Sequence, residues 1–448
     1  MTVPPRHGPG SEKFLSEPFI KRRKMKFETT AIHGGRTVDS DTLSCGTPIY
    51  RTASYLFKST EHAANLFALK ELGNIYTRIG NPTQAVLEER MAELEGGAAS
   101  LALASGTSAI FYTIINICEA GDEIVAANNL YGGTYSQFDS ILPQLGISVK
   151  LVDPADPENF RAAINDRTRA LYCETIGNPG LTVTDIEAVS KIAAEHRLPL
   201  IVDATFTPPC LMRPIDHGAD IVIHSLTKWI GGHGTVIGGI VTDAGTFDWT
   251  DPKFSLFNEP DSSYHGLRYA HDLGEMNPIA FALRMRLVPL RNLGACISPD
   301  NCWSILQGME TLALRMERHS QNGLAVAQFL SGHSRVDWVS YPGLNENANS
   351  ATARRYLKNG SGGMVAFGVK GGLDAGRQFI ESLQLFSHLA NVGDAKSLAI
   401  HPASTTHSQL SQEQLKESGI SSSMIRLSIG IEHIDDILAD LEQALAAG

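Results

Sequence analysis

The sequence predicts an α/β fold with a mostly parallel sheet covered by helices, followed by a smaller C-terminal α+β domain. Three observations support this prediction. Apolar runs rich in β-branched residues alternate with segments of helical period through the first half of the chain. Several of these runs end in side chains that can bind a ligand or react. The alternation stops near residue 240. Strands that alternate with helices are typical of parallel sheets buried on both faces.

The composition is that of a globular protein. The chain has 448 residues, 43% of them hydrophobic, and a formal net charge of −11, which suits two or three domains. An acidic surface repels phosphate backbones, so we expect no nucleic-acid partner. No segment approaches the ~18 consecutive apolar residues of a membrane span, and we expect no membrane contact. The scattered cysteines lack a CxxC pair, which favours a reducing, cytoplasmic location.

The first βαβ unit is read from "SLALASGTSAIFYTIINICEAGDEIVAA". It predicts a strand, a turn at Gly106, a helix, and a second strand over Glu123–Ala127. The alternation continues through the strand-like runs "GISVKLVD", "TRALYCET", "LPLIVDA" and "ADIVIHS" and the helical segments "PENFRAAIND" and "DIEAVSKIAAEH". We therefore expect one sheet built from parallel neighbours.

Three of these strands end in residues that can bind or react. Ser105 to Thr107 follow the first strand, Asp203 follows "LPLIV", and Ser225 to Lys228 follow "ADIVIH". Ligands of open α/β sheets gather at the carboxyl ends of strands, so we expect these residues to converge. Taken singly, Lys228 reads as a solvated amine and Asp203 as a turn cap; taken together they favour a site.

The combination suits pyridoxal phosphate, which needs an amine for its aldehyde, a carboxylate for its ring nitrogen and donors for its phosphate. Lys228 offers the amine and Asp203 the carboxylate. Main-chain N–H groups at Gly106 and Thr107 would open a helix toward the phosphate, and the residues after the later strand would add hydroxyl groups. No metal is expected, because the histidines show no ligand spacing.

The pattern changes after residue 240. The stretch "FDWTDPKFSLFNEPDSSYHG" predicts a long loop or insertion on the surface. One long helical pattern, "NCWSILQGMETLALRMERHSQNGLAVAQFL", then leads into the C-terminal domain, where "GMVAFGV" and "SMIRLSIGIE" predict strands.

Seven motifs stand in a characteristic order: "YTRIGNPT", "ASGTSA", "LYGGTY", "ETIGNP", "HSLTKWIGGHG", "SLAIHPASTTH" and "IRLSIGIEH". From about Thr30 to the C-terminus the chain resembles the Cys/Met-metabolism family of pyridoxal-phosphate enzymes. The resemblance implies the aspartate-aminotransferase-like fold (fold type I). Two departures concern Thr107, where relatives often carry Met or Gln, and Ala399, where many carry Gly.

The resemblance also implies roles for individual residues. Lys228 and Tyr131 would be catalytic, the tyrosine stacking on the cofactor ring. Arg426, helped by Ser397 and with Tyr76 nearby, would bind the substrate carboxylate. Tyr76 and Arg78 would reach the cofactor phosphate of a neighbouring subunit. The implied cofactor-binding residues are Tyr76, Arg78, Ser105, Gly106, Thr107, Tyr131, Asn178, Asp203, Thr205, Ser225, Thr227 and Lys228.

Within the family, "LYGGTY", "PDSSYHG" and "NVGDAKSL" resemble the O-acetylhomoserine sulfhydrylases. These would replace the acetyl ester of O-acetyl-L-homoserine by sulfide, giving L-homocysteine and acetate; methanethiol would give methionine. The alternatives are a cystathionine γ-synthase, a methionine or cystathionine γ-lyase, and a non-catalytic paralogue that keeps the fold. The implied assembly is a homotetramer of two catalytic dimers.

The implied organisation has four parts. Residues 1–26 would be a flexible extension and 27–77 an arm that contacts the neighbouring subunit. Residues 78–312 would form the cofactor-binding domain and 313–448 the C-terminal domain.

Overall fold

The computed structural model describes residues 25–36, 38–344, 350–405 and 421–447. Nearly all of the predicted extension 1–26 lies outside the described residues. The large sheet has seven strands in the order β1-β7-β6-β5-β4-β2-β3. Only β7 runs antiparallel to its neighbours, so the mostly parallel sheet is confirmed. Its strands are β1 Ala99–Leu103, β2 Glu123–Ala127, β3 Ser148–Val152, β4 Thr168–Glu174, β5 Leu200–Asp203, β6 Ile221–Ser225 and β7 Gly239–Asp243.

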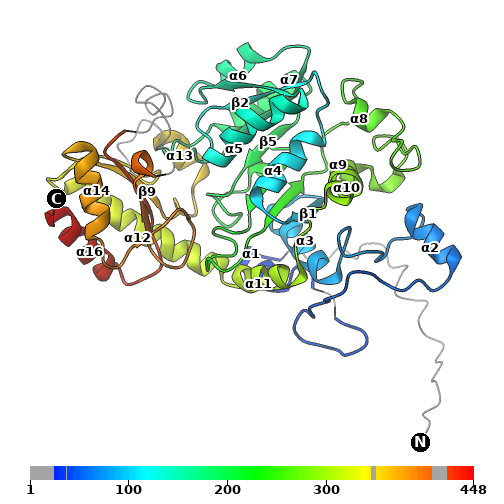
Figure 1. The fold of residues 1–448 in the computed structure, drawn as a ribbon, viewed down its shortest axis with the longest axis horizontal. Helices are drawn as coiled ribbons and strands as arrows, with labels where there is room; N and C mark the ends of the chain where they lie inside the picture. Colours follow the sequence, from blue (N-terminus) through cyan, green and yellow to red (C-terminus); the bar gives the residue numbers. More distant parts are fainter. Residues whose placement is uncertain (1–24, 37, 345–349, 406–420, 448) are drawn as a thin grey trace, which may run out of the picture.

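The central strands are covered on both faces. Every residue of β2, β5 and β7 is buried, as expected for a sheet between two helical layers. Helix α4 packs on β6 and β7, whereas α7 packs on β4 and β5 (Figure 1). The helices of this part are α3 Pro82–Glu95, α4 Gly106–Ile115, α5 Gly132–Ser136, α6 Glu158–Ala163 and α7 Ile186–Glu195.

The stretch 247–266 has little regular structure and many exposed residues, as the sequence predicted, but its aromatic side chains are buried. Trp249, Phe254 and Phe257 are at most 5% exposed and belong to the main hydrophobic core. The ring of Trp249 stacks on Phe257 with centroids 4.2 Å apart. The Asp and Pro residues of this stretch suggested a loop, but the aromatic side chains between them supply core surface. Helix α8 Ser255–Asn258 lies within the segment, and α9 Ala280–Met285 and α10 Arg291–Leu293 follow it.

Two helices, not one, lead into the C-terminal part. Helices α11 Pro299–Glu310 and α12 Leu312–Gly332 meet at Thr311. The small sheet that follows has the order β10-β11-β12-β9-β8 and is antiparallel except between β10 and β11. Its elements are β8 Val336–Ser340, α13 Ser350–Tyr356, β9 Met364–Val369, α14 Gly372–Ser382, β10 Ser387–His388, β11 Leu398–Ile400, β12 Met424–Ser428 and α16 Ile434–Ala447.

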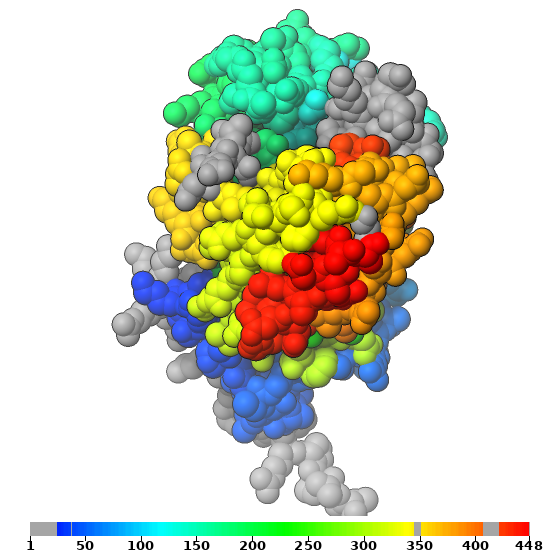
Figure 2. Space-filling view, turned by 90° about the vertical axis from the view of Figure 1, so that its left-hand side faces the viewer, coloured from blue at the N-terminus to red at the C-terminus, as the bar shows by residue number. Residues whose placement is uncertain are grey.

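The small sheet has a hydrophobic core of its own. Phe367 of β9, Val326 of α12 and Ile437 of α16 belong to this second cluster and are fully buried. Figure 2 shows α16 beside α12 on the outer face of the molecule. A separate core under a separate sheet confirms the predicted smaller α+β domain.

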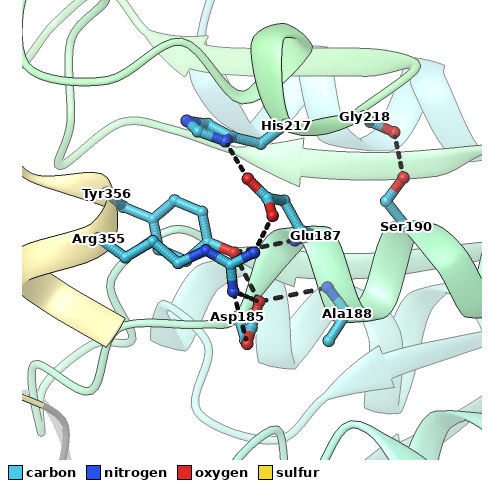
Figure 3. A network of polar contacts seen from close by, with 8 residues as sticks. All are labelled: Asp185, Glu187, Ala188, Ser190, His217, Gly218, Arg355 and Tyr356. Carbon is cyan, nitrogen blue, oxygen red and sulfur yellow. Dashed lines mark hydrogen bonds and ion pairs between the residues drawn. The ribbon is translucent and has the colours of Figure 1, made fainter. Parts of the chain in front are cut away.

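A polar network joins the C-terminal domain to the large sheet (Figure 3). The Tyr356 hydroxyl donates to Asp185 Oδ1 at 2.5 Å and accepts from the main-chain N–H of Glu187 at 3.1 Å. Arg355 pairs with both carboxylates, and His217 Nδ1 lies 2.9 Å from Glu187 Oε1. Because Asp185 also caps α7, the network fixes the start of that helix to α13.

Two helices precede α3: α1 Phe27–His33, which packs on α3 and α11, and α2 Thr60–Phe67. In Figure 1 the part that carries α2 projects away from the body of the molecule. Across the described residues, no helix combines the length and apolar character needed to cross a membrane.

Candidate active site

A cavity of about 250 Å³ lies at the carboxyl ends of the central strands. Residues from both sheets line it, which explains why segments far apart in the sequence share one site. The predicted residues found there are Ser105, Gly106, Thr107, Tyr131, Asn178, Asp203, Thr205, Ser225, Thr227, Lys228 and Arg426; the lining residues that the sequence did not indicate are Ile110, Glu174, Ile176, Phe206, Ile237, Ala390, Asn391 and Val392.

One end of the cavity presents donors for an anion. Ser105 caps α4 by accepting from the N–H of Ser108 at 3.1 Å, and the first-turn N–H groups of that helix have no partner within it. A Cβ at Gly106 would lie 2.7 Å from the Cβ of Ser225, so only glycine lets the helix start approach the end of β6 this closely. Thr227, beside them, adds a hydroxyl group. A phosphate fits this donor set.

Asp203 ends β5 and is buried, with 8% of its surface exposed. The main-chain N–H of Thr205 donates to its Oδ1 at 2.9 Å, and the Thr205 hydroxyl accepts from the N–H of Ser225 at 2.9 Å. Burial raises the pKa of Asp203. No Lys, Arg or His within the described ranges forms an ion pair with it, so its charge lacks the partner that a cationic ring nitrogen would supply.

Lys228 faces the same cavity from the loop after β6. Burial, and next the charge of Arg426, lower the pKa of Lys228 to about 8. The Nζ atom donates to Oδ1 of Asn391, which lies between β10 and β11 of the small sheet. The amine is therefore held by a neutral acceptor and is partly deprotonated near neutral pH.

Arg426 on β12 supplies a cation on the opposite wall. Its Nη1 donates to Asn178 Oδ1 at 2.8 Å, and burial lowers the pKa of Arg426 to about 10, which still leaves it charged at neutral pH. No carboxylate among the described residues pairs with this guanidinium. It is free to receive the carboxylate of a substrate.

Tyr131 begins α5 at the cavity rim, and its side chain is 47% exposed. Its ring lies over Gly133, where a Cβ would come 2.5 Å from the ring atom Cε1. Its main-chain N–H donates to Glu174 Oε1 at 2.6 Å. The ring is thus positioned largely through its own main chain.

Three predicted site residues lie outside this cavity. Tyr76 is 41% exposed, and the Arg78 guanidinium lies 5.2 Å from its ring centre. Ser397 is fully buried; its hydroxyl donates to Glu432 at 2.9 Å and accepts from the N–H of Gly430 at 2.9 Å. These two contacts engage the Ser397 hydroxyl, and its role toward a substrate carboxylate stays a prediction.

Two of the residues that the sequence did not indicate are polar. Glu174 ends β4 as Asp203 ends β5, a position that could have identified it. Asn391 follows a two-residue strand in another domain, and the signal that could have identified it is its place as the first residue of "NVGDAKSL".

The histidines near the lysine have structural partners. His224 is fully buried and bonds to Glu95, and His233 Nδ1 lies 2.6 Å from the carbonyl of Gly231. The described residues contain no group of three or more potential ligands that could hold a metal ion.

Comparison with known proteins gives consistent matches over nearly the whole chain. The profile of the Cys/Met metabolism PLP-dependent enzymes matches residues 28–446. The O-acetyl-L-homoserine sulfhydrylase of Leptospira meyeri is 56% identical over 429 residues, covering 94% of this chain and 97% of that protein. The homocysteine synthase of Schizosaccharomyces pombe is 49% identical, covering 94% and 98%.

A solved structure from Campylobacter jejuni superposes with a TM-score of 0.90 at 41% identity, covering 94% of this chain and all of that one. It contains N'-pyridoxyl-lysine-5'-monophosphate, a lysine joined to the cofactor.

Proposed function

Because the chain belongs to the Cys/Met metabolism family of PLP-dependent enzymes, with the aspartate-aminotransferase-like fold, we propose that it is an O-acetylhomoserine sulfhydrylase. It replaces the acetyl ester of O-acetyl-L-homoserine by sulfide. The observation that carries the proposal is the convergence of Lys228, Asp203 and Arg426 on one cavity, in a chain 56% identical to an enzyme of that name.

The cavity fits pyridoxal phosphate by its donor set. Ser105 to Thr107, Ser225 and Thr227 would hold the phosphate, and Asp203 the ring nitrogen. Tyr131 and Thr205 would lie on the two faces of the ring, with Asn178 near the ring's phenolic oxygen. When bound, the cofactor supplies an aldehyde that joins amines and a cationic ring that accepts electron density from the substrate's α-carbon.

The chain's own residues bind the substrate and move protons. Arg426 holds the α-carboxylate, which orients the α-hydrogen toward the amine of Lys228. The neutral amine takes a proton from the α-carbon and returns it later, and its lowered pKa of about 8 makes this possible near neutral pH. Tyr131, at the rim, would assist these transfers.

In the overall exchange, one nucleophile enters and one leaving group departs. The bond between the γ-carbon and the ester oxygen breaks and acetate leaves with its electron pair; hydrosulfide forms the new carbon–sulfur bond. The product is L-homocysteine. Methanethiol in place of sulfide would give methionine.

The active unit in our proposal is a dimer, and the assembly a tetramer of two such dimers in the cytoplasm. Leu43, Leu56 and Leu72 on the N-terminal arm are 74%, 98% and 72% exposed. So much apolar surface around Tyr76 and Arg78 supports burial against a second copy. Both side chains would then reach the partner's cofactor phosphate, Tyr76 also lying near its substrate. We propose residues 27–77 as this arm, 78–312 as the cofactor domain and 313–448 as the C-terminal domain.

Two experiments test the proposal. The purified protein should show a visible absorbance band that borohydride removes, and Lys228→Ala should lack it. O-acetylhomoserine and O-succinylhomoserine should then be assayed, each with sulfide and with cysteine. Homocysteine from the acetyl ester and sulfide is the expected main product. Preference for cysteine would instead indicate a cystathionine γ-synthase, and sulfide-independent ketoacid release a γ-lyase.

A further inference from the structure

Glu174 is a buried carboxyl in the cavity for which the proposed reaction has no role. It ends β4, and in the parallel pairing of β4 with β5 its partner in register is Asp203. Adjacent parallel strands lie about 4.8 Å apart, and residues in register point to the same face. Two acidic side chains therefore stand side by side, 6% and 8% exposed, at the site where the cofactor ring would bind.

Glu174 is tied to Tyr131 by a short hydrogen bond. Its Oε1 accepts from the main-chain N–H of Tyr131 at 2.6 Å, and its own carbonyl accepts from the Thr184 hydroxyl at 2.7 Å. The Tyr131 ring is 47% exposed and rests on a glycine, so side-chain packing holds it weakly. The hydrogen bond that Glu174 accepts fixes the main chain of Tyr131, and with it the origin of the ring.

Two neighbouring buried carboxyls do not both ionise readily, because each charge disfavours the other. Asp203 has more contacts that favour its anion than Glu174 has. Among them are the main-chain N–H and the hydroxyl of Thr205 and the nearby His224. Glu174 has one such contact, and burial followed by the charge of Asp203 raises its pKa well above the usual range. Neither cation of the described cavity, Lys228 or Arg426, forms a hydrogen bond with Glu174. The shared proton therefore belongs on Glu174.

We propose that Glu174 is a positioning residue: as an uncharged carboxyl it anchors the main chain of Tyr131, and it leaves the negative charge of the pair on Asp203. The inference rests on the proposed function in treating Tyr131 as the residue beside the cofactor ring and Asp203 as the partner of the ring nitrogen. A neutral anchor matters because a second carboxylate would compete with Asp203 for the cationic ring nitrogen and change its protonation.

The test compares Glu174→Gln with Glu174→Ala in the full-length protein. Glutamine is neutral and keeps an oxygen that can accept from Tyr131, whereas alanine keeps neither property. Infrared difference spectra at neutral pH should show a protonated-carboxyl band in the unsubstituted protein that Glu174→Gln removes. Glu174→Gln should bind pyridoxal phosphate within about threefold of the unsubstituted protein, and Glu174→Ala about tenfold more weakly. The circular dichroism of the bound cofactor should likewise fall only in the alanine variant.

Thr184→Val is the matched control, because it removes a bond to the main chain of Glu174 and leaves the carboxyl in place. It should lower the melting temperature without changing the infrared band. The proposal is overturned if Glu174→Gln removes no protonated-carboxyl band, if Gln and Ala weaken cofactor binding equally, or if Ala does not weaken it. None of these readouts uses sulfide chemistry, so a failed sulfhydrylase assay would leave them interpretable.

Discussion

The amine of Lys228 donates a hydrogen bond to the side-chain oxygen of Asn391, a residue 163 positions away in the C-terminal domain. Their loops are in close contact. Gly393 has a φ of +77°, and a Cβ there would lie 2.6 Å from the main-chain nitrogen of Trp229. The small domain thus holds the amine through a neutral acceptor, and this choice has a measurable consequence.

Asn391→Asp should move the activity profile to higher pH. A carboxylate beside the amine favours the ammonium form, so it should raise the pKa of Lys228 from about 8 by roughly one unit or more. Because the neutral amine is the base, the pH of half-maximal kcat should rise by the same amount. Asn391→Ala, which adds no charge, should lower kcat without an alkaline shift. An unchanged profile in the aspartate variant would contradict the contact.

Asp203→Asn should have opposite effects on activity and on stability. Losing a charge-assisted bond of about 1.5 to 3 kcal/mol to the ring nitrogen should lower kcat roughly ten- to a hundredfold. Burial raises the folded-state pKa of Asp203, so the cofactor-free protein loses stability as pH rises through that pKa. The asparagine variant should not.

The melting temperatures of the two cofactor-free proteins, measured across pH, test the second part of this prediction. The variant's advantage should widen as the pH rises from the ordinary aspartate pKa to the raised folded-state pKa of Asp203. A constant difference over that range would mean that folding does not raise the pKa of Asp203.

Arg426→Lys should weaken substrate binding more than cofactor binding. An ammonium cannot make the two parallel bonds that a guanidinium makes to a carboxylate, so KM for O-acetylhomoserine should rise about tenfold or more. Titration with pyridoxal phosphate should give a dissociation constant within about threefold of the unsubstituted protein, because Asp203 and the donors near Ser105 remain. Equal losses in both measurements would indicate that Arg426 supports the cavity rather than the substrate.

The network between α13 and α7 should depend on Tyr356 more than on Arg355 (Figure 3). Tyr356 is 3% exposed, and its hydroxyl serves both Asp185 and the N–H of Glu187, so Tyr356→Phe should cost about 1 to 2 kcal/mol of unfolding free energy. The Arg355 side chain is 46% exposed, and solvent screening should keep Arg355→Ala below about 1 kcal/mol. Urea unfolding of both variants measures these two losses. If the ion pairs of Arg355 dominated, Arg355→Ala would lower the free energy of unfolding more than Tyr356→Phe.

Much of this site could be predicted because its key residues occupy positions defined by local sequence. The β-branched runs specify buried strands, and Asp203 and the Ser225–Lys228 segment directly follow two of them. The carboxyl ends of parallel strands meet at one sheet edge, so order along the chain was enough to bring these groups together. The same logic, applied to β4, would have found Glu174.

Where long-range packing decided the outcome, the sequence was less informative. The aromatic residues of 247–266 carry no regular period, and only the fold placed Trp249 and Phe257 in the core. Ser397 follows the family motif, yet only the fold shows that Glu432 and Gly430 engage its hydroxyl.

By itself, the sequence determined the class of fold, the family, and the strand ends that carry the amine and the carboxylate, because period and position along a strand are local properties. The tertiary structure decided which neutral group holds Lys228 and which second carboxyl stands beside Asp203. Those contacts join chain segments whose separation in sequence contains no information about their distance in space.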